Sequence, residues 1–439
     1  MTTDLNKLRD RAIRITAICL SALLMASCFG GCTKSVESET ESAAETSAVE
    51  TETETEKAIE TETETETETE TETETEITLP DSAEKLEDPD SNITGYSDDP
   101  DTETVHETET EKETEAEVEK KETRIFNYLN GYTTTKELRD RRPVAIMINN
   151  IKNSLPQEGI CDGDIYYECS AEGGITRIMM LVSDYEKLGT VGSIRSSRDY
   201  FVDFLANHDA IYVHAGGSSQ AYEKIAWRKI NNLDGVNQYA PNTFWRDSTR
   251  MYSMGYEHSL MTSGEGIVAG IKQMNYRTEL DPNQVPLFNF YDEETDNKLV
   301  GSPASHVHMQ STAIQTVDFV YNEETGEYLR YQYNGIAHVD GTTGEQISVK
   351  NVIILFTDIS LIPGDTAGRL TVGTVGSGQG YYITNGKRKV INWSRGSKTE
   401  TLHLEYRNGD ELILNCGKTF ICVVDNSVAK KIDFEYSWN

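Results

Sequence analysis

Short apolar runs separated by turn residues dominate the chain between residues 124 and 300. Four of these runs have the length and composition of buried strands: 143–149, 164–169, 175–182 and 210–214. A glycine-bearing loop at 171–174 joins the second and third runs as a hairpin. Segments with helical spacing follow, and strands that alternate with helices are typical of an α/β layer. We therefore predict an α/β fold for residues 124–300.

Two helices are predicted beside these strands. In the first, apolar and aromatic side chains share one face at helical spacing: Phe201, Phe204, Leu205 and His208. Ser193 or Ser196 is expected to cap this helix, because a serine hydroxyl accepts a hydrogen bond from a free backbone N–H group. Ser218 or Ser219 is expected to open the second helix, directly after the strand at 210–214.

The pattern changes at about residue 301, where short β-rich runs replace the mixed pattern. They lie at 328–336, 348–356, 381–384, 389–393, 402–406, 411–415 and 419–424. Asn385-Gly386 and Asn408-Gly409 supply hairpin turns, because both residue types tolerate positive φ. We predict that residues 301–439 form a mainly β domain, a small barrel or a sandwich.

Residues 1–32 have the pattern of an export signal. A basic start precedes a short uncharged core at 15–25, which is too short to span a bilayer comfortably. Small residues precede Cys28 and Cys32, as in the bacterial lipobox, where a cysteine becomes lipidated. Cys28 has the better residues upstream, whereas the polar tract starts directly after Cys32. Both cysteines are lipidation candidates, and an uncleaved anchor is the alternative.

Residues 33–123 form a Thr/Glu-rich tract with 34 acidic and 6 basic side chains. It has no apolar face to bury and its carboxylates repel one another, so we predict a disordered linker. Most of the net charge of −34 belongs to this tract, and residues 124–439 carry a net charge of only −8. They show no basic stripe that would neutralise phosphates, so we expect no nucleic-acid partner.

Charged, histidine and glycine residues gather at the ends of the apolar runs, where a rigid scaffold holds polar groups in the open. The candidate ligand-binding residues are Glu168, Glu172, Arg177, Arg195, Arg198, His214, Ser218 and His258. The corner formed by His214 and the helix start at Ser218 suits an anionic or hydroxyl-rich ligand. We find no cofactor motif and assign no metal site.

Each candidate also has a structural explanation. Arg195 and Arg198, three apart on one predicted helical face, suit a clamp for a carboxylate or phosphate. The alternative is an internal ion pair with Glu168 or Glu172. His214 precedes a glycine pair and a predicted helix start, which suits an anion; the alternative is a tight turn followed by a helix cap.

Other chemistry has weaker support. Glu168 and Glu172 with Arg177 form a set that acid/base hydrolysis would require, but their separation is not set by the sequence. His306 and His308 share a strand face that suits a metal, yet no third ligand is evident.

The cysteines leave two alternatives open. Cys161 with Cys169, and Cys416 with Cys422, are spaced for local disulfides in an exported protein, or remain as buried free thiols.

Several motifs, in order, resemble one bacterial family. The segments 142–150, 164–168, 172–177, 195–198 and 214–218 resemble the N-terminal domain of the YerB-like lipoproteins. Residues that resemble its C-terminal domain are Arg330, His338, Asp340, Asn351, Val352, Gly378, Trp393 and Gly417. Ser193 stands where the family has proline, and Glu257-His258-Ser259 replaces Pro-His-Asn, which weakens a catalytic role for His258. The resemblance implies a two-domain envelope lipoprotein without a settled activity.

We predict a lipid-anchored protein on the extracytoplasmic face of the cell membrane. Its function is expected to be binding of a cell-wall glycan, a peptide or another envelope ligand, because a pocket-like pattern occurs without a recognisable nucleophile system. One alternative is an envelope hydrolase or transferase that uses Glu168, Glu172 and His214. The other is a scaffold that binds another protein.

Overall fold

The computed structural model describes residues 124–237 and 242–438. The predicted export signal, Cys28, Cys32 and the tract at 33–123 lie outside the described residues. The α-helices of the described part are α3 (Lys136–Asp140), α4 (Asp199–Leu205), α5 (Ser219–Trp227), α6 (Ser248–Ser253) and α7 (Gly264–Gln273). None of its helices has the length and apolar composition that crossing a bilayer requires.

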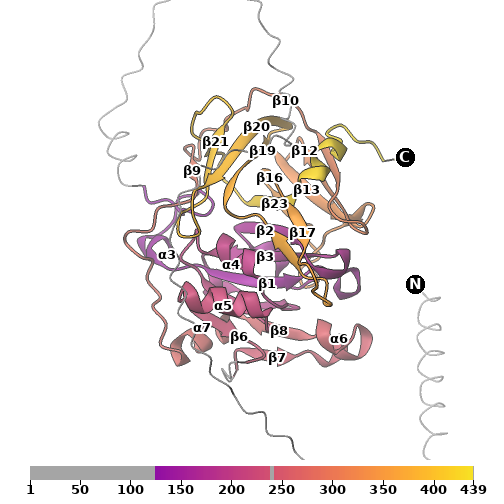
Figure 1. The fold of residues 1–439 in the computed structure, drawn as a ribbon. Helices are drawn as coiled ribbons and strands as arrows, with labels where there is room; N and C mark the ends of the chain where they lie inside the picture. The colour runs from indigo at the N-terminus through magenta and orange to yellow at the C-terminus, as the bar shows by residue number, and fades with distance from the viewer. Residues whose placement is uncertain (1–123, 238–241, 439) are drawn as a thin grey trace, which may run out of the picture. The chain divides into compact units, whose positions relative to one another are not determined.

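An eleven-stranded sheet is the centre of the described part (Figure 1). Its strands, in spatial order, are β10 (Ser302–Pro303), β20 (Lys387–Arg395), β19 (Gly376–Thr384), β16 (Asn351–Thr357), β23 (Thr419–Asp425), β2 (Ile165–Ser170), β3 (Thr176–Val182), β1 (Val144–Asn149), β5 (Ile211–His214) and β6 (Asn232–Asp234); β21 (His403–Tyr406) pairs with β20. The four strands predicted between residues 143 and 214 are all present. The N-terminal part is α/β and the C-terminal part mainly β, as predicted.

The strands after residue 301 form neither a closed barrel nor a self-contained sandwich. β23 pairs in parallel with β2, and β16 pairs in parallel with β23, so strands from both halves share one sheet. In Figure 1 the yellow β23 lies next to the purple β2. All seven residues of β16 are buried, which is typical of a central strand covered on both faces.

The remaining strands form smaller sheets. A five-stranded sheet contains β11 (His306–Gln310), β12 (Thr316–Asn322), β13 (Glu327–Gln332), β14 (Ile336–Ala337) and β15 (Ser348–Val349). A three-stranded sheet contains β4 (Thr190–Gly192), β8 (Leu260–Ser263) and β7 (Phe244–Arg246). The two pairs are β17 (Ile359–Leu361) with β18 (Leu370–Val372), and β22 (Ile413–Leu414) with β9 (Asn289–Phe290).

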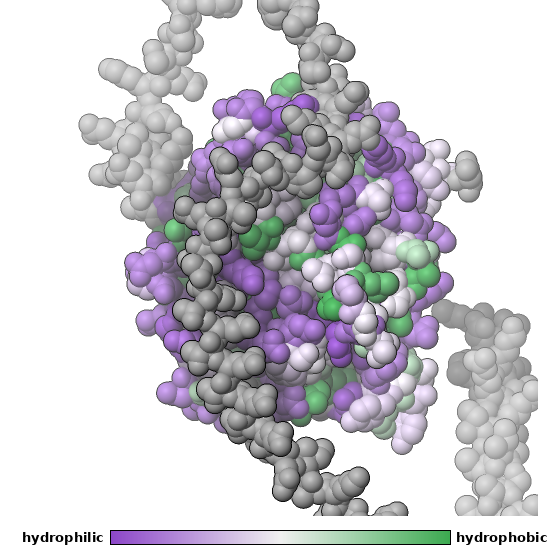
Figure 2. Space-filling view, in the orientation of Figure 1, coloured by the Kyte–Doolittle hydropathy of each residue, from purple (hydrophilic) through white to green (hydrophobic). Residues whose placement is uncertain are grey.

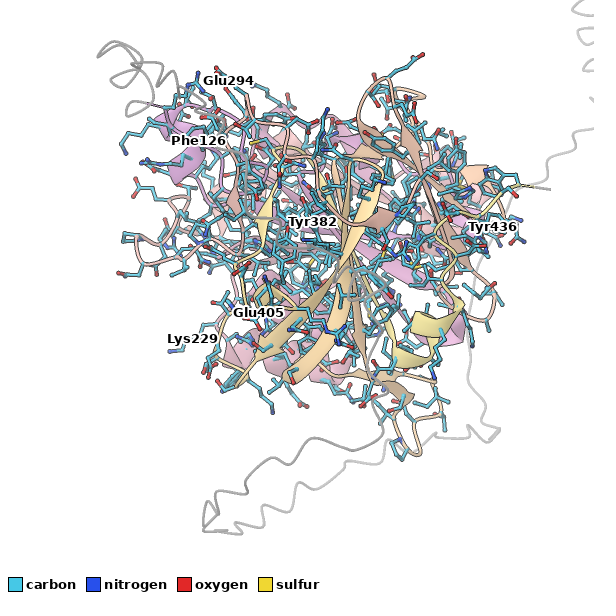
Figure 3. The ribbon with its side chains drawn as sticks, turned by 90° about the horizontal axis from the view of Figure 1, so that it is seen from above. Phe126, Lys229, Glu294, Tyr382, Glu405 and Tyr436 are labelled. Atoms are coloured by element: carbon cyan, nitrogen blue, oxygen red, sulfur yellow. The ribbon has the colours of Figure 1, made fainter. Side chains whose placement is uncertain are left out.

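The core lies on both faces of the large sheet, because successive side chains of a strand point to opposite faces. Ile146 belongs to one apolar cluster together with residues of α7 and the five-stranded sheet. Met147 belongs to the other cluster, together with Phe201 of α4 and Ile225 of α5. Tyr382 of β19 lies in the middle of the side chains in Figure 3, and it is almost fully buried. The face shown in Figure 2 is largely hydrophilic, with hydrophobic residues in small separate groups.

The directions of the strands place the C-terminal ends of several strands at one edge of the large sheet. β5 and β6 run parallel to β1, while β2 is antiparallel to β3, which is antiparallel to β1. β23 and β16 run parallel to β2. Six strands therefore end at the same edge, which we call the carboxyl edge, and such an edge is where open α/β sheets place ligands.

The second predicted helix begins as expected. Ser218 is the N-cap of α5, and its hydroxyl accepts a hydrogen bond from the Ala221 N–H group at 3.1 Å. The prediction for α4 was wrong: this helix begins at Asp199, and its N-cap, Arg198, makes no side-chain cap bond. Backbone bonds to β1 hold the preceding segment extended, since the Arg195 N–H group donates to the Met147 carbonyl at 2.8 Å.

Candidate functional site

The carboxyl edge brings several of the predicted site residues together. Glu168 lies near the end of β2, and Arg177 lies at the start of the antiparallel β3, so both face this edge. His214 ends β5. The extended segment 194–198 crosses the ends of β1 and β5, where Ile194 bridges to Ile148 and Ser197 bridges to Gly217.

Two arginines hold Glu172 between them. Arg177 Nη2 lies 3.2 Å from Glu172 Oε2, and Arg198 Nε donates a hydrogen bond to Glu172 Oε1. Each guanidinium also donates to a backbone carbonyl, Arg177 to Ser196 at 2.8 Å and Arg198 to Ser197 at 2.6 Å. The alternative of an ion pair between Arg198 and Glu172 is therefore present, and each carboxylate oxygen has its own arginine.

A third arginine lies next to this pair with weaker contacts. Arg195 Nη1 donates to the Glu257 carbonyl at 3.3 Å, and its Nη2 lies 3.8 Å from the Glu257 carboxylate, which is 63% exposed. The prediction that Arg195 and Arg198 share a helical face was wrong, because both precede α4. We call Arg177, Arg195 and Arg198 the arginine cluster.

Positive charge exceeds negative charge in the arginine cluster. Burial, followed by the charge of Arg198, lowers the pKa of Arg177 to about 10. Burial also lowers the pKa of Arg195, against the opposing charge of Glu257. Burial disfavours ionised Glu172, but the hydrogen bond from Arg198 and the charges of Arg177 and Arg198 outweigh it and lower its pKa. The Nε atoms of Arg177 and Arg195 are buried without a hydrogen-bond partner among the described residues.

Glu168 belongs to a separate, buried network. Its Oε2 lies 2.7 Å from Arg330 Nη2, and its Oε1 accepts hydrogen bonds from Thr176 Oγ1 at 2.5 Å and Asn150 Nδ2 at 3.1 Å. Arg330 comes from β13 and is fully buried. The sequence includes Arg330 and His338 among the family-like residues but gives no signal that Arg330 pairs with Glu168.

The predicted histidines are buried and hydrogen-bonded. His214 Nδ1 lies 2.9 Å from the Gly216 carbonyl and its Nε2 lies 3.2 Å from Asn232 Oδ1. This geometry matches the tight-turn alternative, with Ser218 as a helix cap. His258 Nδ1 lies 2.9 Å from Asn149 Nδ2, and burial, followed by the charge of Arg195, lowers its pKa. His258 thus lies beside the arginine cluster, while His214 supports the turn.

The other candidate groups make internal contacts. His306 Nε2 and His308 Nδ1 lie 3.1 and 2.6 Å from the same oxygen of Asp318. Within the described part, no group of three His, Cys, Asp or Glu side chains is arranged to hold a metal ion.

The four cysteines of the described part are free thiols, so the disulfide alternative does not hold in this structure. Burial raises the pKa of the Cys161 thiol to about 12, which keeps it protonated.

A cavity of about 1090 Å³ lies elsewhere in the described part. Its walls include Phe126, Tyr128, Arg141, Tyr185 and Pro286, and it contains none of the predicted site residues. Its lining comes from the segment before α3, from α3, from residues 185–186 and from the segment after α7, and no motif in the sequence indicated a cavity there.

Family comparisons match both halves of the chain. Residues 129–277 match the family described as "Protein of unknown function (DUF3048) N-terminal domain", and residues 306–421 match its C-terminal domain. The chain belongs to this YerB-like family. It is 27% identical over 305 residues to "Putative lipoprotein YerB" of Bacillus subtilis (strain 168), a match that covers 69% of this chain and 87% of the relative.

A solved structure has the same fold. The crystal structure of YerB protein from Bacillus subtilis superposes with a TM-score of 0.60 at 25% identity. The match covers 70% of this chain and 99% of the YerB chain. The family resemblance drawn from the motifs is therefore confirmed, and the family name states that its function is unknown.

Proposed function

We propose that this protein is a lipid-anchored extracytoplasmic lipoprotein that binds an anionic envelope ligand, a cell-wall glycan or peptide, at the arginine cluster. The observation that carries the proposal is that Arg177 and Arg198 hold the half-buried Glu172 carboxylate, while the neighbouring Arg195 is only loosely paired with Glu257. Guanidinium groups recognise carboxylates through strong charge-assisted hydrogen bonds. The anchor is supported by the lipobox-like cysteines and by the name of the Bacillus relative.

The hydrolase alternative has less support from the geometry. Glu168 is 3% exposed and paired with Arg330, and His214 is fully buried with both ring nitrogens in contact. A catalytic acid or base has to reach the substrate. These two groups would have to leave their partners first, whereas Arg195 needs no such change.

Arg195→Ala tests the binding proposal. We expect the variant to bind N-acetylmuramyl dipeptide, a wall-derived carboxylate, at least about tenfold more weakly, because a charge-assisted contact is lost. Its thermal unfolding midpoint should stay close to that of the wild type, because the contacts of Arg195 are long and partly exposed. Isothermal titration and thermal unfolding measure both quantities.

The matched control is Arg139→Ala, which removes an exposed arginine of α3 in the wall of the large cavity. We expect unchanged binding. Binding that is lost with Arg139 and kept with Arg195 would move the site to the cavity and contradict the proposal. Wild-type protein that does not bind the dipeptide would reject a wall-derived carboxylate as its ligand.

A further inference from the structure

We infer that the ligand of the arginine cluster presents a carboxylate, and that Glu172 is an internal competitor that occupies the position of this carboxylate in the free protein. The inference rests on the proposed binding role of the arginine cluster and specifies its ligand and its regulation. It follows from how Glu172 is held and from the space around it.

The arginines hold Glu172 as a carboxylate ligand would be held. One carboxylate oxygen of Glu172 contacts Arg198 and the other contacts Arg177, so each guanidinium group binds one oxygen of the same planar carboxylate. Arg177 is buried and bonded to the backbone, which fixes the position of its guanidinium group. Such a preformed pair of donors costs little ordering free energy when a second carboxylate replaces the first.

Glu172 is placed so that it can leave. It lies in the connection between β2 and β3, beside Gly173, which has φ of +72° and no heavy atom within 4 Å of where a Cβ would stand. The Glu172 side chain is 17% exposed and lies in a loop, so its carboxylate borders solvent, and the inferred exchange requires a change of side-chain rotamer only. The backbone of the loop stays tied, since Thr312 Oγ1 donates to the Gly174 carbonyl.

Glu168 shows the contrasting case four residues earlier. Its carboxylate has a fully buried arginine and three further hydrogen-bond donors, on Thr176, Asn150 and Gln315, and it is 3% exposed. A ligand cannot displace Glu168 without opening the core. Excess positive charge also remains only around Glu172, because Arg195 adds a third cation that Glu257 contacts weakly.

The test is rescue of Glu172→Ala by acetate. Removing the carboxylate leaves Arg177 buried without a counter-ion, so the thermal midpoint should fall and acetate should restore it. At equal ionic strength, we expect about 0.1 M acetate to raise the midpoint of Glu172→Ala by about 3 °C more than chloride does, and the wild-type midpoint by no more than chloride. The double variant with Arg198→Ala should lose this rescue.

Glu257→Ala is the matched control, because it removes an exposed carboxylate that contacts Arg195. It should show no preference for acetate over chloride. Acetate that stabilises Glu172→Ala no more than chloride does would overturn the inference. Inorganic phosphate that rescues as well as acetate would overturn the assignment of a carboxylate.

Binding gives a second readout that separates the two proposals. N-acetylmuramyl dipeptide should bind Glu172→Ala about tenfold more tightly than wild type, since no internal carboxylate competes. Glu172→Gln, which keeps the side-chain shape, should give the same ranking if the alanine variant folds poorly. Equal affinities would overturn the internal competitor and leave the binding function intact. Rescue by acetate without binding of the dipeptide would reject the wall-derived ligand and would still support binding of a carboxylate at the arginine cluster.

Discussion

Two glutamates four residues apart have different roles because their surroundings differ. The Glu168 carboxylate lies inside the protein, where Arg330 and three uncharged donors contact it. Glu172 ends in a loop, between two arginines that it does not fully neutralise. Removing one partner of a buried pair strands a charge and costs about 3 to 5 kcal/mol. Removing Glu168 is therefore expected to destabilise the fold, whereas the proposed exchange concerns Glu172 alone.

His338 makes the stability of this buried network depend on pH. Arg330 Nη1 donates to His338 Nδ1, because a guanidinium has no acceptor, so Nε2 carries the proton that faces Gln157 Oε1 at 2.8 Å. Burial, followed by the charge of Arg330, lowers the pKa of His338 well below its ordinary value. The folded protein thus holds His338 neutral.

We expect acid to destabilise the protein through His338. As pH falls, the unfolded chain binds this proton first, so the contribution is fully present above about pH 6.5 and decreases below it by about 1.4 kcal/mol per pH unit. His338→Gln keeps an acceptor for Arg330 and a donor for Gln157. Between pH 7 and pH 5, its free energy of unfolding should fall by about 2 kcal/mol less than that of the wild type.

Urea unfolding at both pH values measures this difference. His403→Gln is the control, because it replaces an exposed histidine outside this buried network. Identical pH dependence in His338→Gln and the wild type would contradict the neutral, buried state of His338.

The candidate site was only partly predictable from the sequence, because one of the contacts that distinguish Glu168 from Glu172 is made by a residue far away in the chain. The hairpin loop placed Glu172 near the ends of two strands, so a pairing with Arg198 was among the alternatives. Which of the two glutamates pairs with Arg198 depends on Arg330, because Arg330 pairs with Glu168. Arg330 is 162 residues from Glu168 in the sequence. No local pattern contains that information, and the pairing follows only from the position of β13.

At the scale of elements, apolar runs predicted where strands lie but not which strands pair. The apolar runs at 143–149 and 419–424 correspond to β1 and β23. Both strands are fully or almost fully buried, which explains their continuous apolar pattern. The parallel pairing of β23 with β2 joins residues about 250 positions apart, for example Ile165 with Thr419. The hairpin turn at 171–174 predicts that β2 pairs with β3, but nothing in the sequence indicates the strand on the other side of β2. A separate β domain was therefore predicted, whereas the two halves share one sheet.

The shared sheet predicts that residues 124–300 do not fold alone. Without β23, the long and buried β2 becomes an unpaired edge with apolar side chains on both faces. We expect the isolated fragment to lack a cooperative thermal transition and to aggregate, whereas residues 124–439 unfold cooperatively. Near-ultraviolet circular dichroism and size-exclusion chromatography compare the two chains. A monomeric fragment with a sharp transition would show that β23 is dispensable for the N-terminal half.

At the scale of the whole molecule, the proposed anchor predicts a modified N-terminus. A single acyl chain holds a protein to a membrane only marginally, so stable residence requires the several chains of a bacterial lipoprotein cysteine. We expect mass spectrometry of the mature protein to find acyl groups on Cys28 or Cys32.

Replacing each cysteine by alanine in turn identifies the one that is used, and the other variant serves as the control. A mature protein that still starts at Met1 without acyl groups would contradict the anchor.

The pairing of β2 with β23 also sets the order in which the chain can fold. A chain that emerges N-terminus first presents β2 long before β23, because β23 begins about 250 residues after β2 begins. Contacts between residues so far apart in the sequence form slowly, because the entropy cost of closing a long loop comes before the contacts stabilise it. The central sheet therefore remains incomplete until the chain as far as Asp425 is available. During that interval β2 is exposed to proteases and chaperones, so we expect the yield of folded protein to depend on how soon β23 becomes available.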